Sequence, residues 1–351
     1  MELKLSNPKI KNTYYAIPSK SVYIRALILA SFLNEKTHLI GKPLSDDICT
    51  CINALKELGA NIFEVDDGVI VEGIKEIDCK KVLNMRDSAM CYRFFHEIVD
   101  NPLISSSRLN ERVKNNVTSQ SVSGKLLRNA IYNLDEEIDM DNENVKSKGY
   151  IDLTKKVIED FKSHPKEYKV EGDFSSASIF LALGAIKGEV RVKGLNANSI
   201  QPDQNILNVL KDFGAEVFIT QDEIRVKHKS LSQVIVDGSL FPDLVPVISL
   251  IGCYSTGETR IQNISYLKYK ESNRLESITS CLKNLGGNVR CTDDEIIVNY
   301  SPLKGGIIDS YNDHRIVMLG GISSLITNED IIIKNYECIS KSYPNFFDNF
   351  R

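Results

Sequence analysis

Residues 52–73 read INALKELGANIFEVDDGVIVEG, and this stretch decides the fold because it recurs twice. The later copies are ILNVLKDFGAEVFITQDEIRVKH (206–228) and ITSCLKNLGGNVRCTDDEIIVNY (278–300). Each copy predicts an amphipathic helix, then a glycine in the left-handed region, then a β-hairpin. The glycines are Gly59, Gly214 and Gly286. Three copies of about twenty residues indicate an internal repeat.

A second kind of helix precedes each copy. Residues 21–33, 175–186 and 243–254 are apolar on almost every face, which is typical of short helices buried in a globular core. A strand follows each of them, so the repeated unit is a buried helix, a strand, an outer helix and a hairpin. Partial units begin at three further places, residues 87–99, 119–132 and 312–326.

The six predicted units divide into three and three, which predicts an α/β protein with two domains. Units 2 and 3, which begin at residues 87 and 119, leave no room for a hairpin, so we expect them to be incomplete. A chain of 351 residues is long enough for two domains that each bury a core. The first half of the protein is therefore expected to be reduced relative to the second.

The composition and charge of the chain argue against several classes of function. A formal charge of −4 provides no overall field for nucleic acid or for an anionic membrane. The eight cysteines form no C-x-x-C pair, which argues against a zinc site. Residues 1–12 lack the apolar core of a signal peptide, and no apolar run approaches the length of a membrane span. We expect a cytoplasmic protein with reduced thiols and no metal.

Charged side chains gather where the buried helices begin. Lys20 with Arg25, Arg93 and Arg315 each fall within about the first two turns of an otherwise apolar helix. Burial of such cations without a partner would be costly. If the helices pack side by side in one direction, their positive ends and these cations form an anion site. Two such domains would clamp a polyanion. The sequence has no P-loop and no G-x-G-x-x-G motif, which argues against a nucleoside triphosphate or a dinucleotide.

The stretch LKYKESNRLESI (267–278) adds to this pattern. Its apolar spacing predicts a helix that begins near residues 271–272. Lys270 and Arg274 would then stand at the positive end of that helix, which disfavours each cation by about 0.3–1 kcal/mol. A bound anion would explain why both cations stand there. Two carboxylates, Asp243 and Glu271, stand among these cations, which keep them ionised and suited to act as general bases.

These stretches resemble the enolpyruvyl transferases, in particular the EPSP synthase family. The most specific matches are PDLVPV, LKYKESNRLESI, YNDHRIVM and SKSYPNFFDNF, and SKSVYIRALILAS resembles the phosphate-binding first helix. The similarity covers essentially the whole chain in order. It implies an inverse α/β fold with an N-terminal domain of residues 20–171. The C-terminal domain would combine residues 1–19 and 172–351, with crossovers near Ser19 and Gly172.

The resemblance implies a reaction without metal or organic cofactor. The enolpyruvyl group of phosphoenolpyruvate (PEP) is added to the 5-hydroxyl of shikimate 3-phosphate, and phosphate is then eliminated. This is a step of the shikimate pathway towards chorismate and the aromatic amino acids. The expected partners are these small-molecule substrates only, with no nucleic acid and no membrane, and the expected state is a monomer.

The same resemblance implies roles for individual residues. Asp243 would take the hydroxyl proton, Glu271 would serve proton transfer at the PEP methylene, and Lys20 is the third expected catalytic residue. Shikimate 3-phosphate would contact Lys20, Ser21, Arg25, Thr118, Ser119, Ser147, Tyr150, Asp243 and Lys270. PEP would contact Lys20, Ala89, Arg93, Arg112, Gln120, Arg274, His314, Arg315 and Lys341.

The sequence also departs from the family pattern. The usual glycine after the proline of the first motif is absent at residues 17–20, and KESNR replaces KESDR at 270–274. Ala89 and Met90 stand where the family has Gly-Thr beside PEP. A methyl group and a lost hydroxyl there predict weak PEP affinity and insensitivity to glyphosate, which occupies the PEP subsite in this family.

Three alternatives stay open at this point. A degenerate homologue would bind shikimate 3-phosphate without turnover, and the reduced N-terminal domain supports it. Retention of the expected site residues argues against it. A transferase acting on UDP-N-acetylglucosamine is less favoured by the KES-x-R and DHR blocks and by the terminal SKSYPNFF. An RNA-modifying relative would need a basic surface, which the composition does not provide.

Overall fold

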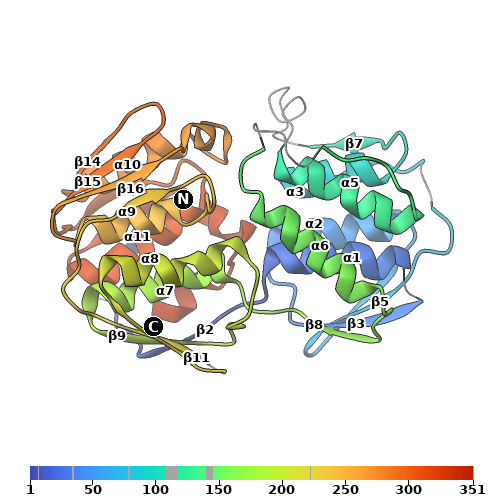
Figure 1. Cartoon of the computed structure of the whole chain (residues 1–351), viewed down its shortest axis with the longest axis horizontal. Helices are drawn as coiled ribbons and strands as arrows, with labels where there is room; N and C mark the ends of the chain where they lie inside the picture. Colours follow the sequence, from blue (N-terminus) through green and yellow to red (C-terminus); the bar gives the residue numbers. More distant parts are fainter. Residues whose placement is uncertain are drawn as a thin grey trace. The chain divides into compact units, whose positions relative to one another are not determined.

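The computed structural model describes residues 1–6, 8–33, 35–77, 80–106, 118–139, 145–221 and 223–350. The chain folds into two compact units, which are coloured along the sequence in Figure 1. The N-terminal unit is the continuous segment Pro18–Glu171. The C-terminal unit combines Met1–Ile17 with Gly172–Arg351. Among the described helices, none combines the length and apolar character needed to cross a membrane.

Three helices that are apolar all round form the centre of the C-terminal unit. They are α7 (Phe174–Lys187), α9 (Val245–Gly252) and α11 (His314–Thr327), and they pack against one another. Asp173 and Asp313 cap α7 and α11 by accepting the N–H of the residue two positions on. Because these helices have no polar face, they are stable only inside the core, as the sequence pattern predicts.

Short sheets and outer helices surround this core. The outer helices α8 (Ile206–Phe213) and α10 (Arg274–Asn284) end before Gly214 and Gly286, whose φ angles of 102° and 86° confirm the predicted left-handed glycines. The sheet orders are β10-β11-β9-β2, β12-β13-β15-β14 and β1-β17-β16. The strands are β1 (Glu2–Leu5), β2 (Thr13–Tyr15), β9 (Glu189–Lys193), β10 (Glu216–Ile219), β11 (Glu223–Lys227), β12 (Ile235–Asp237), β13 (Glu258–Gln262), β14 (Asn288–Cys291), β15 (Ile296–Asn299), β16 (Gly306–Asp309) and β17 (Ile331–Lys334).

The N-terminal unit repeats the scheme with fewer strands among its described residues. Its helices are α1 (Lys20–Leu33), α2 (Asp46–Glu57), α3 (Ala89–Ile98), α5 (Ser119–Tyr132) and α6 (Gly149–Phe161). One sheet has the order β4-β5-β3-β8, with β3 (Lys36–Ile40), β4 (Asn61–Val65), β5 (Gly68–Glu72) and β8 (Glu167–Lys169). The short strands β6 (Leu83–Asn84) and β7 (Ile104–Ser105) pair in parallel. The predicted α/β class is therefore confirmed.

One predicted boundary is wrong. Helix α10 begins at Arg274 rather than near residue 271, because a separate 3-10 helix, η2 (Ser265–Tyr269), ends just before it. Lys270 is the C-terminal cap of η2, so only Arg274 belongs to the helix. The side chains of residues 270–273 are therefore presented by a non-helical connection. This connection allows Glu271 and Arg274 to meet, as described below.

Candidate active site

A buried arginine organises three carboxylates in the C-terminal unit. The Arg274 side chain is 1% exposed. It donates from Nη1 to Asp243 (2.7 Å), from Nη2 to Glu271 (2.9 Å) and from Nε to Asp313 (2.8 Å). Asp243 precedes α9, Glu271 precedes α10 and Asp313 caps α11, so this one guanidinium joins the starts of three helices. We call Asp243, Glu271, Arg274, Asp313 and Arg315 the Arg274 cluster.

Arg315 completes the cluster in a different way. Its Nη2 donates to Asp243 Oδ2 at 2.9 Å, and its Nη1 faces the sulfur of Met318 at 3.8 Å. Its Nε is buried and has no hydrogen-bond partner within the described parts of the chain. Arg315 therefore keeps donor capacity for a ligand, whereas Arg274 already donates to carboxylates from all three of its nitrogens.

The Arg274 cluster holds its two outer carboxylates ionised. Burial opposes the charge of Asp243, but Arg315, Arg274 and Lys270 outweigh it and keep the pKa of Asp243 well below its usual range. Burial likewise opposes the charge of Glu271, yet Arg274, Lys341 and His314 hold the pKa of Glu271 well below its usual range. Their side chains are 24% and 21% exposed, so both carboxylates can reach a ligand while Arg274 lies beneath them.

All the residues predicted for the site in this unit lie in or around this cluster. His314 is the first residue of α11, is 1% exposed, and places Nδ1 3.9 Å from Asp313 Oδ1. Lys341 ends the 3-10 helix η3 (Tyr336–Lys341) and acts electrostatically on Glu271. Lys270 acts in the same way on Asp243. Residues separated by up to about a hundred positions thus share one electrostatic environment.

The N-terminal unit has its own buried arginine. Arg25 on α1 is 1% exposed and donates to Thr154 Oγ1 (2.7 Å), to Ser123 Oγ (3.4 Å) and to the carbonyl oxygens of Ser21 (2.8 Å) and Tyr150 (3.3 Å). These acceptors are neutral, and no carboxylate of the described residues pairs with it. Burial therefore lowers the pKa of Arg25 to about 10. Within the part of the chain that the structure describes, Arg25 is thus a buried positive charge without a carboxylate partner.

Other predicted residues surround the starts of α1, α3 and α5. Lys20 Nζ pairs with Asp47 Oδ2 at 2.9 Å, and the Lys20 side chain is 16% exposed. Arg93 on α3 donates to the side chain of Gln120 on α5. Thr118 caps α5 by accepting the N–H groups of Gln120 and Ser121. The pairings of Lys20 and Arg93 leave both side chains partly exposed.

The remaining residues predicted for the site differ in how deeply they are buried. Ser21 is half-buried beside Arg25, while Ser119 and Ser147 are 7% and 5% exposed. Ala89 is the first residue of α3, and the Met90 sulfur lies 3.9 Å from Arg25 Nη1. Arg112 lies outside the described residues.

Two carboxylates of these clusters were missed by the sequence interpretation. Asp47 pairs with Lys20 across 27 positions, and Asp313 pairs with Arg274 across 39 positions. Asp313 belongs to the recognised stretch YNDHRIVM, but an aspartate at the start of a helix is most often only a cap. Each is at most 5% exposed at its side chain, and burial of an aspartate is the signal that points to a paired charge.

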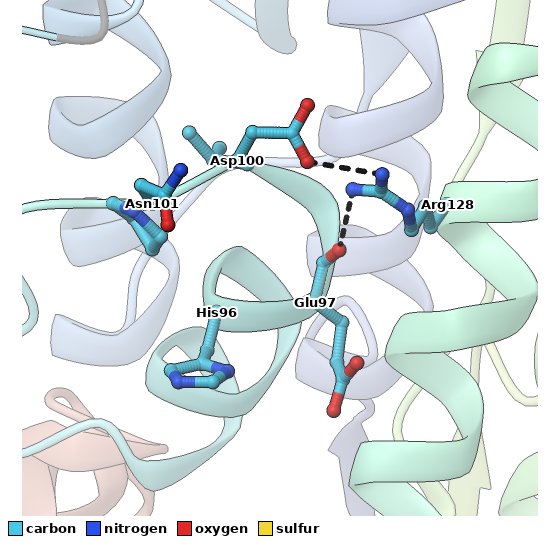
Figure 2. A pocket seen from close by; sticks show the side chains of 7 residues that line it. His96, Glu97, Asp100, Asn101 and Arg128 are labelled. Atoms are coloured by element: carbon cyan, nitrogen blue, oxygen red, sulfur yellow. Dashed lines mark hydrogen bonds and ion pairs between the residues drawn. The ribbon is translucent and has the colours of Figure 1, made fainter.

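A surface pocket of the N-terminal unit lies at the other end of α3 and contains none of these residues. It is lined by His96, Glu97, Val99, Asp100, Asn101, Pro102 and Arg128. Figure 2 shows Arg128 reaching the Asp100 carboxylate (3.0 Å) and the Glu97 carbonyl oxygen (3.1 Å). Arg128 thus satisfies free carbonyl groups at the end of α3, which is a structural role.

Comparison with solved structures defines the class of protein. An EPSP synthase from Acinetobacter baumannii matches with a TM-score of 0.75 and 18% identity, over 99% of this chain and 96% of that chain. The enolpyruvyl transferase NikO from Streptomyces tendae matches with a TM-score of 0.73 and 12% identity, again over 99% and 96%. The chain therefore has the enolpyruvyl transferase fold.

Sequence comparison identifies the family. The model of EPSP synthase (3-phosphoshikimate 1-carboxyvinyltransferase) matches residues 9–101 and 162–350. A 3-phosphoshikimate 1-carboxyvinyltransferase from Clostridium botulinum (strain Eklund 17B / Type B) is 31% identical over 417 positions, which cover 99% of this chain and 96% of the relative. The enzyme of that name from Clostridioides difficile (strain 630) is 30% identical, with the same coverage. The chain belongs to the EPSP synthase family.

Proposed function

We propose that this protein transfers the enolpyruvyl group of PEP to the 5-hydroxyl of shikimate 3-phosphate, which gives 5-enolpyruvylshikimate 3-phosphate and phosphate. Family membership supports this reaction. The observation that carries it is the pair of ionised, partly exposed carboxylates, Asp243 and Glu271, fixed on the buried Arg274. Addition and elimination need two placed proton acceptors, and the two carboxylates that Arg274 fixes support that requirement.

Residues in and around the Arg274 cluster have distinct roles in this proposal. Asp243 accepts the proton of the 5-hydroxyl, and Glu271 exchanges a proton with the PEP methylene carbon. Arg274 positions both carboxylates, because it donates to each of them. Arg315 and Lys341 bind the anionic groups of PEP, with His314 beside them. Lys270 contacts shikimate 3-phosphate and helps to keep Asp243 ionised.

The N-terminal unit contributes anion binding to the same proposal. Arg25 and Lys20 provide positive charge for the substrates, and the polar helix starts at Ser21, Ser119 and Thr118 provide hydrogen bonds. Ser147 and Tyr150 line the shikimate phosphate subsite. Arg93 with Gln120, beside Ala89, contacts PEP, and Arg112 is assigned to PEP as well. Lys20 contacts both substrates and is the third catalytic residue.

Phosphate release from PEP, measured with and without shikimate 3-phosphate, tests the reaction. Release that requires shikimate 3-phosphate is expected. The Glu271→Gln variant keeps the shape and removes the base, so turnover should fall by about 10²–10⁴ while substrate affinities change little. Glu295→Gln is the matched control in the same unit, because Glu295 pairs with Arg260 outside the cluster. Equal turnover in both variants would remove Glu271 from the mechanism.

A second candidate is a homologue that binds shikimate 3-phosphate without turnover. The family match omits residues 102–161, and the 417-position alignment is longer than this chain of 351 residues, so the chain lacks segments that the relative has. Binding of shikimate 3-phosphate without phosphate release would support this candidate. Phosphate release that depends on UDP-N-acetylglucosamine instead would support the other transferase activity.

The setting of the reaction follows from the proposed substrates. PEP and shikimate 3-phosphate are small molecules, and the reaction requires neither nucleic acid nor a membrane. We assign the protein to the cytoplasm as a monomer. Light scattering of the purified chain would test the monomer.

A further inference from the structure

A serine next to Glu271 ties the connection before α10 to the start of α11. Ser272 Oγ donates to Asp313 Oδ2 at 3.0 Å and also lies 2.8 Å from Ser277 Oγ. Asp313 is fully buried, and Ser277 on α10 is 2% exposed. The two hydrogen bonds therefore join three elements, which are the connection of residues 270–273, helix α10 and helix α11.

The hydrogen bonds of the two serines run in one direction. A hydroxyl has one proton to donate and two lone pairs that accept. Because the Asp313 carboxylate accepts, the single proton of Ser272 is given to it, and Ser277 then donates to Ser272. Asp313 Oδ2 also accepts from Arg274 Nε at 2.8 Å. Ser272 and Arg274 thus donate to the same carboxylate oxygen, which places both side chains relative to α11.

The start of α10 lacks the side-chain hydrogen bond that usually fixes a helix start. Asn273 is the N-cap of this helix, but its side chain accepts none of the free N–H groups. Its Oδ1 is buried and has no hydrogen-bond partner within the parts of the chain that the structure describes. The residues just before α10 are therefore not held by a cap of their own, which gives the bond from Ser272 to Asp313 a larger share in holding them.

Glu271 depends on this arrangement because it directly precedes Ser272. Its backbone belongs to the non-helical connection, and its carboxylate accepts from Arg274 Nη2 at 2.9 Å. Arg274 in turn donates to Asp313 from Nε and, at 3.3 Å, from Nη2. Asp313 thus supports this glutamate in two ways, through the backbone at Ser272 and through the guanidinium of Arg274.

We propose that Ser272 is a positioning residue for Glu271. Its hydroxyl acts through the neighbouring carboxylate and not through contact with a substrate. The inference rests on the proposed function in treating Glu271 as the group that transfers a proton. A displaced base slows the chemical step but leaves the groups that bind the substrates in place, so the effect should fall on kcat and not on KM.

The first measurement is kcat and KM of the full-length protein for the wild type, Ser272→Ala and Ser272→Thr. Removal of the hydroxyl should lower kcat about ten- to a hundredfold and change the KM of either substrate less than about threefold. Ser272→Thr keeps the hydroxyl and should restore most of the turnover. A raised KM with unchanged kcat in Ser272→Ala would overturn the inference, because the hydroxyl would then serve binding.

Ser280→Ala is the matched control for this measurement. Ser280 lies on α10, is half-buried like Ser272, and places its Oγ 3.1 Å from Tyr311 Oη, outside the Arg274 cluster. Loss of this hydroxyl should leave kcat unchanged. Equal kcat in Ser272→Ala and Ser280→Ala would contradict the proposal.

A further variant tests the direction of the hydrogen bonds. Ser277→Ala leaves the proton of Ser272 on Asp313, so kcat should fall by only about two- to tenfold, less than in Ser272→Ala. A larger loss of kcat in Ser277→Ala than in Ser272→Ala would overturn the inference, because Ser277 would then be the residue that fixes Glu271.

Hydrogen exchange separates this inference from the proposed function, because it does not require turnover. The backbone N–H groups of residues 270–273 should exchange at least about fivefold faster in Ser272→Ala, and at the wild-type rate in Ser280→Ala. That result in a protein that releases no phosphate from PEP would refute the proposed reaction and support the placement of Glu271 by Ser272. Unchanged exchange would overturn the inference. Faster exchange with unchanged kcat in an active protein would refute the inference and leave the proposed reaction intact.

Discussion

Arg274 of the C-terminal unit and Arg25 of the N-terminal unit are both 1% exposed and both lie in the first turns of a helix. Arg274 donates to three carboxylates, whereas the acceptors of Arg25 among the described residues are hydroxyl and carbonyl oxygens and the sulfur of Met90. Burial opposes both charges. The carboxylates raise the pKa of Arg274 well above its ordinary value, whereas burial lowers the pKa of Arg25 to about 10.

The difference shows that two buried arginines near helix starts can have different uses. Arg274 is the fixed centre of a nearly neutral network, and its contribution is to hold Asp243 and Glu271 in place. Arg25 has no charged partner among the described residues, so an anionic ligand would stabilise it. The first arginine therefore serves stability and orientation, while the second serves binding. Three substitutions test this contrast.

The largest expected effect comes from Arg274→Gln. The variant leaves three carboxylates together without their shared cation, so the free energy of unfolding should fall by about 3–5 kcal/mol. Urea denaturation of the full chain measures it. The control is Arg290→Gln, because Arg290 pairs with Glu258 on the surface of the same unit and is 54% exposed. If both variants lose equally little stability, the Arg274 cluster does not hold the unit together.

Replacement of Arg25 by Met should have a smaller effect on stability and a clear effect on binding. The substitution removes a buried charge together with its hydrogen bonds, so stability should change by about 1–2 kcal/mol. The affinity for shikimate 3-phosphate, measured by calorimetry, should fall ten- to a hundredfold. Arg128→Met in the same unit serves as the control, because Arg128 closes the far end of α3 (Figure 2). Normal affinity in Arg25→Met would contradict the assigned binding role.

The smallest effect is expected at the start of α3, where Met90 contacts Arg25. A double variant, Ala89→Gly with Met90→Thr, removes a methyl group and returns a hydroxyl beside the guanidinium. PEP affinity should rise about tenfold, and glyphosate, which is longer than PEP, should gain somewhat more. Titrations of both ligands into the wild type and the variant measure this. If the wild type binds glyphosate as tightly as the variant, steric exclusion at residue 89 is wrong.

Much of the fold could be predicted from the sequence because its signals are local. The all-apolar helices around residues 175–186 and 312–326 and the glycines after the outer helices each follow from a short periodic pattern. The start of α10 was misplaced because the residues before it are equally compatible with a helical turn. The 3-10 helix η2 (Ser265–Tyr269) ends just before α10, and no pattern in the sequence marks where it ends.

The site could be predicted in its members but not in its pairings. Lys20 and Asp243 stand out as charges beside apolar helices, and Arg274 stands out as a cation at a predicted helix start. Asp47 and Asp313 do not, because an aspartate at a helix start is common and the cation that pairs with each lies 27 or 39 positions away. Whether a cation is paired with a carboxylate or is available to a ligand depends on residues that are distant in the sequence. The local periodicity of the sequence does not predict these pairings.

The pairing of distant strands determines when each part of the protein can fold during synthesis on the ribosome. The N-terminal unit is one continuous segment and is complete at residue 171. Strand β2 cannot pair until β9 has been synthesised, and strand β1 cannot pair until β17, at residues 331–334, has been synthesised. At about 5–20 residues per second, that last wait is on the order of 10–30 s after the N-terminal unit has emerged. Throughout this time β1 exposes unpaired backbone groups, so the first residues translated in the C-terminal unit are among the last to find their place.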